Sequence, residues 1–193
     1  MGACQSSYPG LTEDVLEELT TLTYLNKGEI LYLMKKFYSI APEKLEADYH
    51  HRFQKKELLK KFQVLQNNPF QDRLFKVFSS QEDDCFSFED LVDLCSAMSS
   101  ECPTETKAAW AFRIFDLDDD NQISHRDIKE ILDRLTWDPN NRTNFLSKGE
   151  KAKIAEIILE ETKLDNSGSI GMSEFKIIIS RLPEFKSSFY FSL

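Results

Sequence analysis

Glycine and proline are scarce in this chain, with six of each among 193 residues. Because proteins built from many short strands need frequent turns of these residues, the scarcity disfavours a β-rich fold. No apolar run approaches about 18 residues, so no segment has the length of a membrane-spanning helix. No secretory signal is recognisable either, which leads us to expect a protein of a reducing, cytoplasmic compartment.

The cysteines and histidines form no pattern typical of a reactive site. The four cysteines include no CxxC pair and no Cys/His set with zinc spacing, so we expect free thiols. His50 and His51 have no plausible nucleophile or ligand set beside them, and we expect a protein that is not an enzyme. The formal net charge of −9 repels phosphate backbones, so we also expect no nucleic-acid partner.

What the sequence does contain is helical periodicity along most of its length. Asn26 with Glu29, and Ser147 with Glu150, have the form of capping boxes and predict that helices begin directly after the first residue of each pair. Further helices are predicted at residues 13–22, 54–66, 70–78, 88–99, 104–115, 124–136 and 172–182.

A weak repeat organises these helices: an apolar helix, a polar loop, one apolar residue, and a second apolar helix. The clearest copy reads AWAFRIF–DLDDDNQISHRD–IKEIL, and a second reads AEIILEET–KLDNSGSIGMSE–FKIII. A more eroded copy is RLFKVF–SSQEDDCFSFED–LVDL. A first copy would pair residues 30–40 with residues 54–62 around a long irregular loop. Such units in two pairs predict an all-α EF-hand fold of the calmodulin and calcineurin B type. The expected parts are a flexible terminus at residues 1–10, an N-terminal pair at 11–100, a C-terminal pair at 101–182 and an apolar tail at 183–193.

The third loop, residues 116–127, has the clearest metal-binding pattern. A hard cation such as Ca²⁺ takes oxygen ligands from positions 1, 3, 5, 7, 9 and 12 of a 12-residue loop. Those positions hold, in order, Asp116, Asp118, Asp120, Gln122 through its carbonyl, Ser124 through water, and Asp127. Asn121 replaces the usual glycine at position 6 and tolerates positive φ. Asp127 is one methylene shorter than the usual Glu, which weakens Ca²⁺ binding and makes Mg²⁺ more competitive.

The fourth loop, residues 163–174, has an irregular ligand set. Its register places Asp165, Ser167, Ser169 and Glu174 at positions 3, 5, 7 and 12, but Lys163 at position 1. A cationic side chain there opposes a bound ion. Two interpretations stay open: weak Ca²⁺ binding, or a structural loop in which the ammonium stands in for the metal. The second loop, residues 79–90, has too few fixed oxygens, and we expect no metal in it.

At the level of longer motifs, the sequence resembles the calcium- and integrin-binding protein family. The stretches that carry the resemblance are NNPFQDRLFKVFS, FSFEDLVDL, AFRIFDLDDDNQIS, DNSGSIGMSEF and PEFKSSFYFSL. The resemblance implies a non-enzymatic protein with two degenerate N-terminal hands and two C-terminal hands that take Ca²⁺ or Mg²⁺. Asp127 fits the family pattern, whereas Lys163 departs from it. The resemblance also implies that the partner is a helical cytoplasmic segment of a membrane protein, such as an integrin α tail or a transmembrane channel-like (TMC) mechanotransduction channel.

The first residues, MGACQSS, fit the N-myristoylation pattern, with Gly2 as the acceptor. One myristoyl chain binds membranes only marginally, and a palmitoyl group on Cys4 would make the anchoring stable. An unmodified terminus is the alternative. With acylation, the expected location is peripheral, at the inner face of the plasma membrane.

Paired EF-hands open an apolar groove that takes an amphipathic helix. The candidate groove residues are Phe112, Phe115, Ile128, Ile131, Leu132, Ile154, Ile158, Ile178 and Leu182. The apolar tail after Pro183 suggests the hypothesis that it occupies this groove until a partner displaces it.

Three functions remain open from the sequence. The first is a metal-dependent adaptor on a membrane protein, and the second is a constitutive auxiliary subunit of an ion-channel complex with a structural, non-sensing metal. The third is a phosphatase regulatory subunit like calcineurin B, which the single complete ligand set disfavours.

Overall fold

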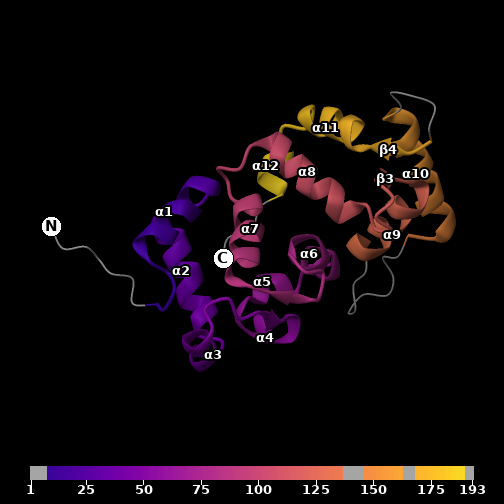
Figure 1. The fold of residues 1–193 in the computed structure, drawn as a ribbon. Helices are drawn as coiled ribbons and strands as arrows, with labels where there is room; N and C mark the ends of the chain where they lie inside the picture. The colour runs from indigo at the N-terminus through magenta and orange to yellow at the C-terminus, as the bar shows by residue number, and fades with distance from the viewer. Residues whose placement is uncertain (1–7, 137–145, 163–167, 190–193) are drawn as a thin grey trace. The chain divides into compact units, whose positions relative to one another are not determined.

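The computed structural model describes residues 8–136, 146–162 and 168–189. The described residues divide into two units, an N-terminal unit that ends at Cys102 and a C-terminal unit that begins at Pro103. Each unit contains helices joined through one two-stranded antiparallel sheet (Figure 1). The predicted all-α EF-hand architecture is confirmed.

The N-terminal unit consists of α1 (Glu13–Leu22), α2 (Lys27–Tyr38), α3 (Pro42–Ala47), β1 (Phe53–Gln54), α4 (Lys55–Lys61), α5 (Gln63–Gln66), α6 (Gln71–Phe78), β2 (Cys85–Phe86) and α7 (Phe88–Met98). The capping box predicted before α2 is present, since Asn26 Oδ1 accepts from the Glu29 N–H at 3.1 Å and Glu29 Oε2 accepts from the Asn26 N–H at 2.8 Å. This reciprocal pair satisfies two N–H groups that a helix start leaves open.

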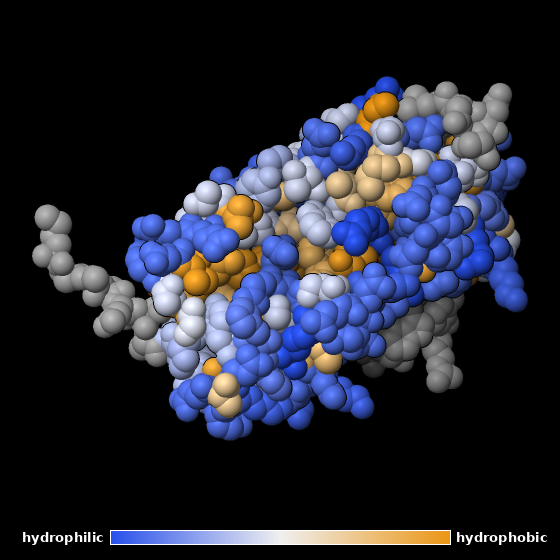
Figure 2. All heavy atoms as spheres, in the orientation of Figure 1, coloured by the Kyte–Doolittle hydropathy of each residue, from blue (hydrophilic) through white to orange (hydrophobic). Residues whose placement is uncertain are grey.

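Aromatic side chains fill the core of the N-terminal unit. Phe53 of β1 pairs with Phe86 of β2 across the sheet, and both are fully buried. Phe37 packs edge-on to Phe53 with ring centroids 5.0 Å apart, and Phe75 lies 4.5 Å from Phe86. On the face drawn in Figure 2 the surface is mostly hydrophilic, with apolar side chains gathered over α1 and α2.

Two expectations for this unit were wrong. The helix predicted over residues 54–66 is interrupted at Phe62, whose backbone lies at φ −112° and ψ 73°. The break brings both Phe62 and Leu65 into the core, and burial of these two side chains outweighs the lost helical hydrogen bonds. The segment expected to be a long irregular loop contains α3, which Pro42 begins at the first helical position, where proline is favoured.

The C-terminal unit consists of α8 (Thr104–Phe115), β3 (Gln122–Ile123), α9 (His125–Thr136), α10 (Lys148–Glu161), β4 (Ile170–Gly171), α11 (Met172–Ser180) and α12 (Phe185–Ser188). The capping box predicted at Ser147 and Glu150 is present at the start of α10. Ile123 and Ile170, the apolar residues of the third and fourth loops, face each other across the sheet.

The core of the C-terminal unit joins α8 to α11. Its buried members are Ala108, Ala111, Phe112, Ile123, Ile128, Ala155, Ile170, Phe175 and Ile179. The tail contributes to the edge of this cluster, because Phe185 and Phe189 pack against it from α12. None of the helices in the described residues is long and apolar enough to cross a membrane.

Candidate metal centre

The third loop connects α8 to α9 and has a tightly wound backbone. α8 ends at Phe115, and the N–H of the next residue, Asp116, caps the helix by donating to the Phe112 carbonyl at 2.8 Å. Asp119 and Asn121 then adopt positive φ, at 59° and 64°. The expectation that Asn121 tolerates the left-handed conformation at position 6 is confirmed. This winding turns the loop back on itself and sends alternate side chains toward one point.

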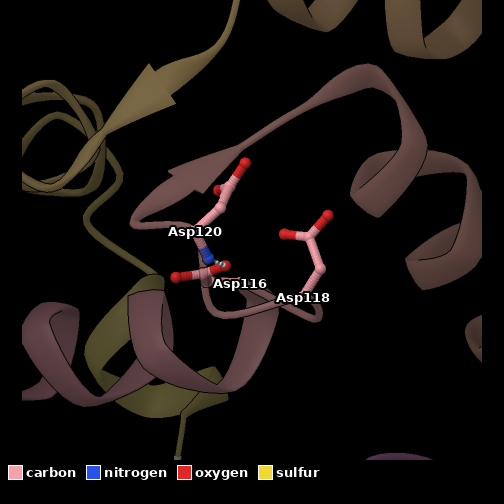
Figure 3. A group of neighbouring side chains, drawn as sticks. All are labelled: Asp116, Asp118 and Asp120. Atoms are coloured by element: carbon pink, nitrogen blue, oxygen red, sulfur yellow. Dashed lines mark hydrogen bonds between the residues drawn. The ribbon is translucent and has the colours of Figure 1, made fainter.

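Asp116, Asp118 and Asp120 place carboxylate oxygens within 4.8 Å of one another (Figure 3). Asp116 is only 5% exposed, and it accepts the Asp120 N–H at 3.1 Å and the Asn121 N–H at 2.9 Å. Burial raises the pKa of Asp116, because a charged carboxylate loses its hydration there. A divalent cation bound beside Asp116 would offset this loss of hydration by stabilising the charged carboxylate. All the donors are oxygens, so the set fits a hard cation such as Ca²⁺ or Mg²⁺.

Asp127, predicted as the last ligand, is 1% exposed and bonded within the loop. Its Oδ1 accepts from the Leu117 N–H at 3.2 Å, and its Oδ2 accepts from the Ser124 N–H at 2.9 Å and the Ser124 hydroxyl at 2.6 Å. Asp127 therefore joins the two ends of the loop and also caps α9. The side chain of Gln122 contacts the sister loop, where its Oε1 accepts from the Ser169 hydroxyl at 2.9 Å.

For the fourth loop, the structure describes only the second half. Lys163, Asp165 and Ser167 lie outside the described residues, so metal binding in this loop stays a prediction. Gly168 has a φ of 78°, as position 6 of such a loop requires. Glu174, at position 12, accepts from the Gly171 N–H at 2.9 Å, which is the helix-capping role that Asp127 has in the third loop.

One important residue was missed from the sequence. Arg52 places its guanidinium inside the second loop, where it contacts Asp83 and Asp90. The position of Arg52 follows from aligning a first 12-residue loop with residues 46–57. In that alignment Phe53 is the apolar position 8 and Arg52 is position 7. The same register places Glu46, Asp48 and Glu57 at positions 1, 3 and 12, which are ligand positions of such a loop.

The predicted groove residues separate into three groups. Phe112 and Ile128 are buried core residues, and Leu182 is 51% exposed. The half-buried ones are Phe115, Ile131, Leu132, Ile154, Ile158 and Ile178. Four of them, Phe115, Leu132, Ile158 and Ile178, pack against the buried cluster from its edge, as Phe185 and Phe189 do.

Fold and loop geometry define a calcium-binding protein of the EF-hand class, and a family model for an EF-hand domain pair matches residues 82–135. Calcium and integrin-binding family member 2 from Mus musculus and from Homo sapiens are each 32% identical over 182 residues, covering 93% of this chain and 94% of the relative. Member 3 from Homo sapiens is 30% identical over the same shares. The chain belongs to the calcium and integrin-binding family. It is a Ca²⁺- and Mg²⁺-binding adaptor protein, and none of these relatives is named as an enzyme.

Proposed function

We propose that this protein is a non-enzymatic adaptor whose C-terminal unit binds an amphipathic helix from the cytoplasmic region of a membrane protein. In this proposal Asp116, Asp118 and Asp120, with the Gln122 carbonyl, Ser124 through water, and Asp127, hold Ca²⁺ or Mg²⁺ in the third loop. Bound metal supplies positive charge at the meeting point of α8 and α9 and so sets the spacing of these helices. Gly2 and Cys4, which lie outside the described residues, would anchor the chain at the inner face of the plasma membrane.

The observation that carries this proposal is the position of α12. Phe185 and Phe189 stack on each other with centroids 5.5 Å apart and pack against the apolar cluster of the C-terminal unit. The fully buried Lys107 donates from Nζ to the Phe189 carbonyl at 2.7 Å, at the C-terminal end of α12. The chain's own short aromatic helix thus lies where we propose that a partner helix binds.

The partner class follows from this chemistry and from the family. Phe185 and Phe189 lie at positions i and i+4 against an apolar edge, and EF-hand pairs bind target helices by laying such apolar anchors into a hydrophobic groove. The relatives carry integrin binding in their names. We therefore propose an integrin α tail as the first partner to test and a TMC-type channel segment as the second.

Removing residues 186–193 tests whether the tail competes with the partner. The truncated chain should bind an integrin α tail peptide about tenfold more tightly, because the peptide no longer displaces a tethered competitor. Fluorescence anisotropy with the labelled peptide measures the change. Lys186→Gln is the matched control, since it alters an exposed residue of the same helix and should leave the affinity unchanged. Unchanged or weaker binding by the truncated chain would count against the tail as a competitor.

A second candidate function is a constitutive channel subunit whose metal is structural. It is favoured by Asp127, because the hydrogen bonds of Asp127 already close the third loop without using a metal. The two functions differ in their response to Ca²⁺.

Titration with Ca²⁺ in millimolar Mg²⁺ distinguishes a sensor from a structural site. A sensor should show a conformational change at a Ca²⁺ concentration of roughly 10⁻⁷–10⁻⁵ M, the range of regulatory EF-hands. We expect the shorter Asp127 to place the midpoint at the weak end of that range. Near-ultraviolet circular dichroism measures the response, because it reports the packing of the chain's aromatic side chains. The absence of any change would favour the constitutive subunit.

A further inference from the structure

The second loop, residues 79–90, has the backbone of a metal-binding loop although its sequence is degenerate. Glu82 and Asp84 adopt positive φ, at 53° and 55°. They are the fourth and sixth residues of the loop, the same positions at which Asp119 and Asn121 adopt positive φ in the third loop. Left-handed conformations at non-glycine residues are costly and persist only where the surroundings impose them. Something in the second loop therefore replaces the organising effect of an ion.

The end of the second loop also matches the third. Asp90, at position 12, is 3% exposed and accepts from the Ser80 N–H at 3.0 Å and the Ser87 N–H at 2.9 Å. These donors are the second and ninth residues of the loop. Asp127 accepts from the N–H groups of the same two positions in the third loop. Two loops with different sequences thus share one hydrogen-bonding frame.

The guanidinium of Arg52 lies inside this frame. Its Nη2 donates to the Ser79 hydroxyl at 2.9 Å, to Asp83 Oδ1 at 2.8 Å and to the Cys85 carbonyl at 2.7 Å. Its Nη1 donates to Asp90 Oδ2 and to the Ser80 hydroxyl, both at 2.8 Å. Ser79, Asp83, Cys85 and Asp90 are positions 1, 5, 7 and 12, four of the positions from which EF-hand loops supply oxygen ligands. The guanidinium thus contacts the oxygens that a metal ion would contact.

The pairing of β1 with β2 explains how Arg52 reaches this place. Because Phe53 faces Phe86, Arg52 is the residue just before the sheet and its side chain crosses to the neighbouring loop. Gln122 has the equivalent position in the C-terminal unit and likewise crosses to Ser169. In both units the side chain at position 7 of one loop thus contacts the neighbouring loop. An arginine at this position places a permanent positive charge there.

The charges in the second loop are balanced by this arrangement. The Arg52 side chain is 15% exposed, and that of Asp90 is 4% exposed. The hydrogen bonds and charge of Arg52 lower the pKa of Asp83 to about 2. A buried carboxylate such as Asp90 without a cation would be strongly unfavourable, and a guanidinium satisfies several oxygens at once with its planar set of donors.

We propose that the Arg52 guanidinium is the resident cation of the second loop, and that it covers a latent divalent-metal site formed by Ser79, Asp83, the Cys85 carbonyl and Asp90. It excludes Ca²⁺ and Mg²⁺ from this loop and keeps the loop in the metal-bound conformation at every metal concentration. The N-terminal hand pair is thereby held together by an internal charge, and the second loop takes no part in the response of the chain to metal.

Calorimetric titration of the full chain with Ca²⁺ tests the proposal by stoichiometry. The double variant Arg52→Gln/Ser79→Asp removes the resident cation and restores a carboxylate at position 1. It should bind one more Ca²⁺ per chain than the unaltered protein, with a dissociation constant on the order of 10⁻⁴ M. Lys56→Gln is the matched control, because Lys56 is an exposed cation beside the same loop, and it should add no site. No additional ion in the double variant would overturn the proposal.

Two further measurements keep the test decisive. If the double variant is unfolded without metal, Ca²⁺ should restore its far-ultraviolet circular dichroism, and failure to do so counts against a latent site. Asp83→Asn in the otherwise unaltered chain should leave the Ca²⁺ stoichiometry unchanged, and a loss of one ion would show that metal enters the loop beside Arg52. Because the readout is a difference between variants, it does not depend on whether the third loop binds as proposed.

Discussion

Replacing Asp116 with Asn is expected to weaken metal binding by the third loop about 100-fold or more. Asp116 is the least exposed carboxylate of the cluster, and it also receives the two N–H groups that wind the loop. The amide keeps the size of the side chain but removes a full negative charge from a position next to the ion. Each tenfold loss of affinity corresponds to about 1.4 kcal/mol, and loss of a charged ligand at a buried site exceeds twice that amount. Calorimetric titrations with Mg²⁺ and with Ca²⁺ measure the change.

Asp119→Asn is the matched control for this experiment. It removes the same charge from the same loop, but Asp119 stands at position 4, which supplies no ligand. Its effect should be limited to the general loss of one nearby negative charge, within about threefold. Equal losses in both variants would mean that the loop attracts cations by net charge alone and would contradict a coordinated ion. Retention of full affinity by the Asp116 variant would assign the metal to another loop.

Replacing Phe86 with Ala is expected to destabilise the N-terminal unit by about 3–5 kcal/mol, the usual cost of truncating a buried phenylalanine. Phe86 is fully buried, it lies 4.5 Å from the Phe75 ring and it pairs with Phe53 in the sheet. The substitution opens a cavity at the point where two loops meet. Chemical denaturation followed by circular dichroism measures the free energy of unfolding.

Leu22→Ala is the control for the core substitution. Leu22 ends α1 and is 72% exposed, so its truncation should change stability by no more than about 0.5 kcal/mol. If the Phe86 variant were as stable as the Leu22 variant, the aromatic pair across β1 and β2 would not be a core contact. The Arg52 arrangement would then lose its support, because the sheet register aims that side chain.

The helix starts and loop registers were predictable because their signals are local. A capping box involves residues only three apart, and both predicted boxes occur at the predicted residues. Ile123 and Ile170 are the single apolar residues that the repeat places in the third and fourth loops, and they pair across the sheet. The convergence of Asp116, Asp118 and Asp120 follows from alternate positions in one short loop. The free thiols of Cys85 and Cys95 also agree with the expectation from the sequence.

The features that the sequence did not reveal depend on contacts between distant residues. The interruption at Phe62 lies inside a stretch of good helical pattern, and core packing decides it. Arg52 contacts residues 27 to 38 positions away in the chain, so no window of sequence contains the arrangement. The hydrogen bond from Lys107 to the Phe189 carbonyl spans 82 positions. A sequence pattern shows that these side chains are polar or apolar but does not show which partner each one meets.

The sequence by itself determined that this protein is built from helix–loop–helix units, that one loop carries four carboxylates at ligand positions, and that residues 183–193 are rich in aromatic side chains. These properties depend on neighbours in the chain, and backbone sterics and hydrogen bonding impose them locally. The tertiary structure alone decided that a guanidinium fills the second loop and that Phe185 and Phe189 lie on the C-terminal cluster. Pairing of the loops through a two-stranded sheet brings charges from separate segments within hydrogen-bonding distance. A buried carboxylate needs hydrogen-bond donors or a cation around it, and for Asp90 the guanidinium of a distant residue supplies both.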